Sequence, residues 1–396
     1  MIRKYQYYRK IFKDKELPLA FVDLDLFDEN VRAIIERAGQ KRIRVASKSI
    51  RCTHLIKRIL DSSPKYQGIM CFTLPEAVFL SQAGFDDLLA AYPCCQPKLI
   101  TSVCEEVKKG KSITLMLDSA EHVKMHQHCA EKCGVVLPVC IDIDMSSTFP
   151  GLHFGVWRSG VFNANQASAL YEIIRACPNL KLDGIMGYEA QIAGVADNYP
   201  GQTIKNTIVR LLKKKSIKSL AARREEAVKK LIKNGAAFRF VNGGGTGSLE
   251  STGKEDAVTE VTVGSGFYSS ALFDNYSDFR HLPSAGFAIE IVRKPRQGVY
   301  TCHGGGYTAS GAIGQDKQPV PYLPEGAMLT KNEGAGEVQT PVIYNGNEHL
   351  NIGYPIFMRH SKAGELCERF NSLWLVSDGK IVDEAKTYRG EGKCFL

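Results

Sequence analysis

Eight short apolar runs, separated by stretches of helical pattern, constrain the fold of this chain more than any other feature. Several are almost continuously apolar, for example residues 69–72 and 139–141, which is typical of parallel strands buried on both faces. The runs cover residues 43–47, 68–72, 88–92, 113–117, 137–142, 182–188, 237–242 and 260–263. Eight strands alternating with helices predict an α/β fold of the TIM type, a (β/α)8 barrel. The alternative is a doubly wound open sheet, which usually contains fewer repeats.

The pattern changes after residue 278, where helical periodicity ends and glycines and prolines become frequent. Up to that point the candidate helices cover residues 53–62, 75–83, 120–132 and 166–176. Beyond it, strand-like runs cover residues 286–293, 298–302, 355–359 and 373–376. We therefore expect a barrel domain over residues 1–278 and a C-terminal all-β domain over residues 279–396. An early run at residues 17–24 could pair with either domain.

Composition excludes several classes of protein. The chain has 396 residues, 44% hydrophobic and 23% charged, which is ordinary for a folded protein and unlike a disordered or fibrous one. Residues 1–16 lack the apolar core of a secretory signal, and no stretch is long and apolar enough to cross a membrane. We therefore expect a cytoplasmic protein whose twelve cysteines are reduced thiols.

The net charge of +9 is concentrated in two stretches. Residues 211–235 contain nine basic and two acidic side chains, and residues 1–16 contain six basic and two acidic ones. Apolar residues recur through residues 211–235 at helical spacing, which predicts an amphipathic helix with a solvated basic face. Nucleic-acid binding would more often combine basic residues with interleaved aromatic ones, so we expect no nucleic-acid partner.

Lys48 directly follows the first predicted strand, in the sequence Val45-Ala46-Ser47-Lys48-Ser49. Lysines at strand ends are common and often simply exposed. In a barrel, however, the loops after the strands form the active-site face, so this amine is expected at the barrel mouth. An amine that is partly desolvated there is able to form a Schiff base.

Two glycine-rich segments follow the seventh and eighth predicted strands. They are Gly243-Gly244-Gly245-Thr246-Gly247-Ser248 and Gly264-Ser265-Gly266-Phe267-Tyr268. A single run of this kind often marks a turn. Phosphate sites in such barrels frequently use the loops at these two places, where backbone N–H groups converge on the anion. A phosphate site combined with a reactive lysine suggests pyridoxal phosphate.

These segments resemble the alanine racemase-like, fold type III family of pyridoxal-phosphate enzymes. The resemblance is carried by residues 18–25 with Asn30, by residues 44–48, and by Asp142-Ile143-Asp144 followed by Arg158-Ser159-Gly160-Val161. Tyr188 with the first glycine-rich segment is similar to the D-threonine aldolase and D-serine dehydratase branch. The resemblance extends over nearly the whole chain, and its ordered set of motifs is more specific than any one of them.

The resemblance implies a role for each matching position. Lys48 would carry the Schiff base and move the proton on one face of the cofactor. Arg158 would contact the phenolic oxygen of the cofactor, and Tyr188 would lie beside its ring. The residues expected to hold the phosphate are Gly244, Gly245, Thr246, Gly266 and Phe267. A solvated surface role for Arg158 and a buried packing role for Tyr188 are the alternatives.

The branch also has a metal site in its β domain, formed by a histidine and, two residues later, a cysteine or aspartate. This chain matches the histidine with His360, but its second position is Lys362, whose ammonium group cannot bind a cation. Either Glu365 or Cys367 takes that role after a local shift, or Lys362 supplies the positive charge, which we favour. The presence of a divalent metal therefore stays open.

Two further segments contain histidines that could act in chemistry or in metal binding. His303 opens a glycine-rich stretch with Tyr307, which suits a mobile general acid or base but equally a surface turn. One helix face collects His122, His126, Cys129 and Cys133. Four ligands from a single helix fit a tetrahedral zinc ion poorly, so we interpret this face as core packing.

The resemblance thus implies a pyridoxal-phosphate-dependent lyase for a D-β-hydroxy-α-amino acid, acting by retro-aldol cleavage or by dehydration and deamination. His360 and its cationic neighbour would engage the β-hydroxyl, and a homodimer would complete each site. A racemase is the enzymatic alternative. A protein that binds pyridoxal phosphate for homeostasis is the alternative outside catalysis, but such relatives resemble the barrel alone. A scaffold role explains neither Lys48 nor the glycine-rich segments.

Overall fold

The computed structural model describes residues 3–362 and 364–396. The chain divides into two compact units that are not consecutive in sequence. One contains residues 34–48, 56–264 and 395–396, and forms the barrel. Among the described residues, the other contains 3–33, 49–55, 265–362 and 364–394, and forms a β sheet. Two helices, α2 (Leu24–Ala38) and α3 (Thr53–Ser62), have residues in both units.

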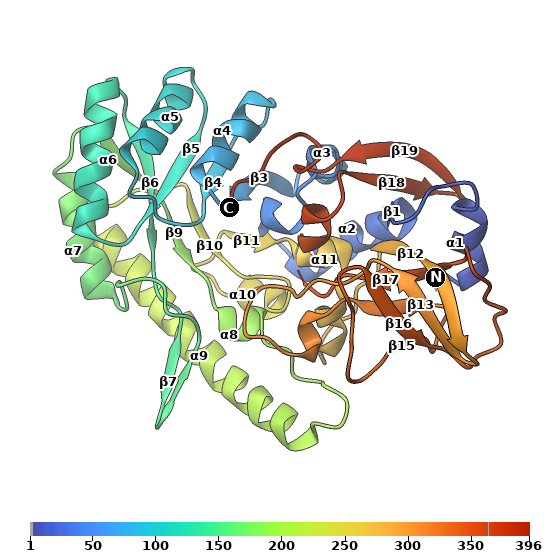
Figure 1. Ribbon diagram of the computed structural model, residues 1–396. Helices are drawn as coiled ribbons and strands as arrows, with labels where there is room; N and C mark the ends of the chain where they lie inside the picture. Colours follow the sequence, from blue (N-terminus) through green and yellow to red (C-terminus); the bar gives the residue numbers. More distant parts are fainter. Residues whose placement is uncertain (1–2, 363) are drawn as a thin grey trace. The chain divides into compact units, whose positions relative to one another are not determined.

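The barrel is closed and its neighbouring strands are parallel, as predicted (Figure 1). Around the barrel the strands are β2 (Arg42–Ala46), β3 (Tyr66–Cys71), β4 (Leu88–Ala90), β5 (Ile113–Leu117), β6 (Leu137–Asp142), β9 (Leu180–Gly187), β10 (Phe240–Gly243) and β11 (Glu260–Val263). Each coincides with one of the eight apolar runs, with ends that differ by three residues at most. The barrel prediction is confirmed, and the open sheet is wrong.

Helices alternate with the strands. They are α4 (Leu74–Gln82), α5 (Pro97–Lys108), α6 (Ala120–Cys133), α7 (Ala164–Arg175), α8 (Ala190–Ala193), α9 (Thr203–Lys233) and α10 (Leu249–Gly253). Side-chain oxygens cap three of them, since Thr73, Ser119 and Asn163 each accept a hydrogen bond from the backbone N–H three residues later. A short hairpin of β7 (Ser147–Phe149) and β8 (Leu152–Phe154) follows β6, and its apolar pattern was too short to be predicted.

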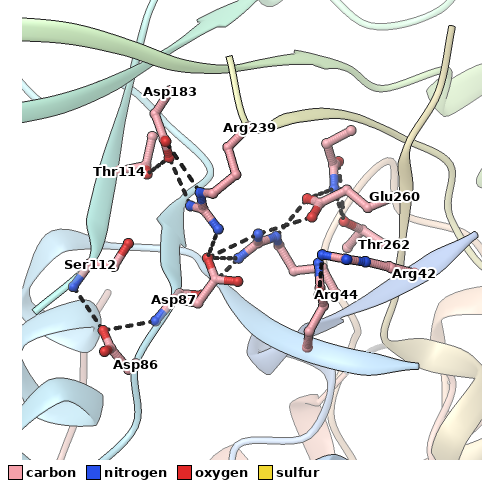
Figure 2. Close-up of polar contacts among 12 residues, drawn as sticks. Arg42, Arg44, Asp86, Asp87, Ser112, Thr114, Asp183, Arg239, Glu260 and Thr262 are labelled. Atoms are coloured by element: carbon pink, nitrogen blue, oxygen red, sulfur yellow. Dashed lines mark hydrogen bonds and ion pairs between the residues drawn. The ribbon is translucent and has the colours of Figure 1, made fainter. Parts of the chain in front are cut away.

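The barrel interior is apolar in its middle and ionic toward the N-terminal ends of the strands. The apolar part comprises Leu89, Met116, Cys140, Met186 and Phe240, with Met70 packed against it. Figure 2 shows the ionic part, in which the fully buried Arg44 binds Glu260 and Asp87. Arg239 extends this network to Asp87 and Asp183. The polar network therefore lies at the opposite end of the barrel from the strand ends that carry Lys48 and the glycine-rich loop.

The second unit is a nine-stranded sheet. Its strands are β1 (Leu19–Asp23), β12 (Ala285–Arg296), β13 (Val299–His303), β14 (Val320–Leu323), β15 (Met328–Leu329), β16 (Gln339–Ile343), β17 (Pro355–Arg359), β18 (Ser372–Ser377) and β19 (Lys380–Lys386). The early strand β1 pairs with β12 and β18, so it belongs to this sheet. Its helical segments are α1 (Tyr5–Ile11), α11 (Ser265–Tyr268), η2 (Ala271–Asn275), η3 (Gln315–Lys317) and η4 (Glu365–Glu368).

The two basic stretches are not purely surface features, which corrects the sequence interpretation. Within α9, Lys213 is buried in an ion pair with Asp197, and Arg224 is fully buried. Near the N-terminus, buried Arg3 forms an ion pair with Asp23. The net charge does not reveal these residues, because a basic side chain that is buried in an ion pair adds the same charge to the total as a solvated one. Among the described residues, none of the helices is long and apolar enough to cross a membrane.

Candidate active site

Lys48 lies in a single 3-10 turn, η1 (Ser47–Ser49), immediately after β2. The turn is anchored because the Ser47 hydroxyl donates a hydrogen bond of 3.0 Å to the carbonyl of Met70 at the end of β3. The half-buried amine of Lys48 donates to the phenol oxygen of Tyr92 over 3.5 Å. The predicted reactive amine is therefore at the C-terminal end of the barrel, held by two neighbouring strands.

Arg158 lies among aromatic rings at the same end of the barrel. Its guanidinium carbon is 5.1 Å from the ring centre of Tyr188 and 5.4 Å from that of Tyr92. The loop that carries it is fixed to β6, because the Ser159 hydroxyl donates to the carbonyl of Asp142 over 2.7 Å. Arg158, Tyr188 and Tyr92 thus converge from the ends of different strands, as expected of a barrel active site.

Two groups at this end have strongly shifted pKa values. Burial raises the pKa of Asp142 to about 7, with Arg158 lowering it and Asp118 and Asp144 raising it further. Burial also raises the pKa of Tyr188 to about 12, against the opposing charge of Arg158. A buried carboxyl with such a pKa exchanges its proton near neutral pH, which is typical of functional sites.

The first glycine-rich loop continues from β10 and approaches its neighbours closely. Gly244 has φ +83°, a conformation that favours glycine. A Cβ on Gly245 would lie 2.7 Å from the Cβ of Ala193 and 3.1 Å from the Tyr188 ring. The carbonyl of Thr246 accepts a hydrogen bond of 2.8 Å from Arg37. The backbone of this loop is therefore fixed against Tyr188, with no room for side chains at Gly245.

A buried ionic cluster lies beneath the loop. The N–H of Gly245 donates to the Ser248 hydroxyl over 3.0 Å, and that hydroxyl donates to Glu189 over 2.7 Å. Arg224 of α9 donates to Glu189 over 2.8 Å and to the carbonyl of Gly187 over 2.9 Å. The Ser248 hydroxyl thus orients the loop by linking it to Glu189. Sequence reasoning missed Glu189 and Arg224, although Glu189 directly follows Tyr188 at a strand end.

Gly266 and Phe267 lie in α11, at the start of the sheet unit. Both are buried, and the carbonyl of Phe267 accepts hydrogen bonds from Asn30 and Ser284. Their expected contribution to a phosphate site stays a prediction.

His360 follows β17 within the sheet unit and is fully buried, with its ring 6.1 Å from the ring of Tyr268. Nearby in sequence, Lys362 donates to the carbonyl of Ser310 over 3.0 Å. The two alternative metal partners are engaged elsewhere. Cys367 donates to the carbonyl of Ile50 over 3.2 Å, and Glu365 accepts from the backbone of Ser310 over 2.8 Å.

These donors do not fit a metal site. Burial raises the pKa of the Cys367 thiol well above its usual value, which opposes the thiolate that a metal would need. Across residues 3–362 and 364–396, no group of three or more histidine, cysteine, aspartate or glutamate side chains is arranged to hold a metal ion. We therefore derive no step that depends on a metal.

His303 is exposed at the end of β13, and its glycine-rich stretch is more fixed than we expected. The N–H of Gly304 donates to Val338, and its carbonyl accepts a hydrogen bond of 2.7 Å from Thr340. Tyr307, further along, is held near the Phe287 ring. The hydrogen bonds at Gly304 fix the segment that carries His303. The acid–base role of His303 stays a prediction.

The sequence profile of the family described as alanine racemase, N-terminal domain, matches residues 22–271, which is more than half of the chain. The chain belongs to this family. The family match covers every barrel strand, and it begins within β1, at residue 22.

Comparison with individual proteins agrees with this family. A 3-hydroxy-D-aspartate aldolase of Paracoccus denitrificans (strain Pd 1222) is 24% identical over 268 residues, which is 66% of this chain and 63% of that protein. The match thus spans less than two thirds of the relative's length.

Among solved structures, a D-threonine aldolase from Filomicrobium marinum superposes with a TM-score of 0.81 at 16% identity, covering 96% of both chains. A D-threo-3-hydroxyaspartate dehydratase from Delftia sp. HT23 superposes with a TM-score of 0.76 at 19% identity, covering 95% of this chain and 98% of that one. At these identities the structures establish the fold that this family member shares with them, a TIM-type barrel with a β-sheet domain.

Proposed function

We propose that this protein is a pyridoxal-phosphate-dependent lyase that acts on a D-β-hydroxy-α-amino acid. The observation that carries the proposal is the cluster of Lys48, Tyr92, Arg158 and Tyr188 at the C-terminal end of the barrel. This cluster lies beside a glycine loop that has no room for a side chain at Gly245. The names of the aldolase and dehydratase relatives support the same substrate class.

The residues at the barrel mouth fit pyridoxal phosphate. Lys48 offers an amine for covalent attachment, Arg158 a positive charge, and Tyr188 a flat surface for the ring. Gly244, Gly245 and Thr246, with Gly266 and Phe267, are assigned to the phosphate, and the fixed backbone of the first three supports this assignment. When bound, the cofactor supplies an electron-accepting ring that stabilises negative charge at the substrate Cα.

The chain's own groups then handle protons. For a D substrate, we assign removal of the Cα proton to the Nζ amine of Lys48. We assign the proton of the β-hydroxyl to His360, with the positive charge of Lys362 replacing a metal, and keep His303 as a further acid or base. Deprotonation of the hydroxyl favours cleavage to glycine and an aldehyde, whereas its protonated departure favours ammonia and a keto acid.

Product analysis tests the reaction. The protein is incubated with pyridoxal phosphate and D-threonine, D-serine, D-3-hydroxyaspartate or D-alanine. Aldehyde with glycine, or keto acid with ammonia, from a β-hydroxy substrate supports the proposal and assigns aldolase or dehydratase. Formation of the L-enantiomer alone would show a racemase and overturn the lyase assignment. Cofactor binding without any product would favour the homeostasis role.

The remaining assignments are also proposals. We propose that residues 1–278 bind the cofactor, that residues 279–396 form the C-terminal domain, and that the protein is a cytoplasmic homodimer. The size of the protein in solution, measured by light scattering, tests the dimer, and a monomeric mass at micromolar concentration would contradict it.

A further inference from the structure

Tyr92 is a residue of the barrel mouth to which the proposed reaction gives no role. It lies two residues after the end of β4, and its side chain is 37% exposed. Its phenol oxygen accepts the hydrogen bond from Lys48, and the Lys48 amine also lies 5.9 Å from the centre of its ring. The phenol oxygen therefore contacts the amine that the proposed reaction requires.

The charges that face Tyr92 come from four elements around the barrel end. Lys48 of η1 and Arg158 of the loop after β8 are positive, whereas Asp142 of β6 is acidic and Tyr188 after β9 is a second phenol. Partial burial favours the neutral phenol, but the two positive charges and the hydrogen bond from Lys48 outweigh it. The pKa of Tyr92 is consequently below its usual value of 10.0.

We propose that Tyr92 is a positioning residue for Lys48, because its phenol oxygen holds the amine at the barrel mouth by a hydrogen bond. The inference rests on the proposed function, because it assigns a task to Lys48.

This pairing has a consequence for cofactor capture. Attachment requires the amine to be held where it meets the incoming carbonyl, so its rate depends on the contact that positions Lys48. Arg158 places a second positive charge against the Tyr92 ring, which stabilises the phenolate.

Tyrosinate absorbance of the cofactor-free protein tests the proposal without any catalysis. In the wild type, one of the sixteen tyrosines should ionise first, at a pH below 10. Tyr92→Phe should abolish that first step, and Lys48→Met and Arg158→Gln should each move it to higher pH. Tyr66→Phe is the control, because burial raises the pKa of Tyr66, and it should leave the step in place. Circular dichroism confirms folding of each variant.

A first step that survives in Tyr92→Phe, or that stays in place in both Lys48→Met and Arg158→Gln, would overturn the proposal. A second readout is the rate of pyridoxal phosphate capture, followed by visible absorbance. We expect capture by Tyr92→Phe at pH 8 to be several-fold slower than by the wild type and by Tyr66→Phe, and equal rates would also overturn the proposal. If pyridoxal phosphate does not bind at all, the proposed function is wrong, but the tyrosinate titration still tests the contact between Tyr92 and Lys48. The failure of one proposal can therefore be distinguished from the failure of the other.

Discussion

The carboxyl of Asp142 is buried at the C-terminal end of β6, where its charged form is poorly solvated. Its pKa in the folded protein is about 7, above the ordinary 3.8. Below pH 3.8 the carboxyl is protonated in both states and contributes nothing to stability. As the pH rises toward 7, the unfolded chain loses this proton more easily than the folded one, so folding becomes less favourable.

We therefore predict that Asp142→Asn stabilises the protein increasingly between pH 4 and pH 7, by up to about 1.4 kcal/mol per pH unit, and by a constant amount above that range. Urea unfolding of the two proteins at several pH values measures the difference. A difference that is independent of pH would contradict the prediction.

Asp87 provides a control of opposite sign. Arg44 and Arg239 outweigh its burial and lower its pKa (Figure 2), so its charge contributes stability above the unfolded pKa, and this is lost as the pH falls. Asp87→Asn should thus cost stability at pH 7 and progressively less in acid. A cost that grows in acid would show that the assigned electrostatics are wrong.

Gly245 gives a second prediction for a single residue. Gly245→Ala places a Cβ within 2.7 Å of Ala193, so the loop must shift, at a cost of about 1–3 kcal/mol in unfolding free energy. We also expect at least a tenfold weaker affinity for pyridoxal phosphate. Gly253→Ala is the matched control, since its nearest contact would be an ordinary 3.5 Å. Equal effects of both substitutions would argue against a fixed loop at Gly245.

Helix α9 shows at the level of an element how a basic stretch is divided between surface and interior. Arg224 is fully buried between Glu189 and Glu255, whereas Lys229 pairs with Glu225 at the exposed surface. Breaking a buried pair leaves an uncompensated charge, which is expensive, but an exposed pair contributes little. The part of α9 next to the glycine loop is therefore its energetically important part.

Arg224→Met should destabilise the protein by about 3–5 kcal/mol, because the buried Glu189 loses its positively charged partner. Adding Glu189→Gln should recover part of that loss. Lys229→Met, the control on the same helix, should change stability by less than about 0.5 kcal/mol. Chemical denaturation measures all three, and similar losses for both single variants would refute the assignment.

The elements themselves were largely predictable. Several of the eight strands are almost continuously apolar, which is a strong signal, and Lys48 and the first glycine loop follow from their places after strands. The buried roles of Lys213 and Arg224 were not predictable, since their acidic partners are distant in sequence or lie in loops. Tyr92 has the same position after a strand as Lys48, and the same rule applied to every strand would have found it.

At the scale of the whole molecule, the chain order and the spatial order differ. Residues 3–33 fold with the sheet unit because β1 pairs on both sides with strands from the C-terminal part of the chain. Sequence patterns detect a strand but not its partners, so a run at residues 17–24 alone left both domains possible. The family assignment and the fold agree, and together they make Lys48 the centre of the functional account.

The most direct test of that account is to locate the cofactor. The protein is incubated with pyridoxal phosphate, reduced with borohydride, digested and analysed by mass spectrometry. We predict one modified lysine, Lys48, and loss of the visible absorbance and of the modification in Lys48→Ala. Modification at other lysines alone, or none at saturating pyridoxal phosphate, would contradict the account.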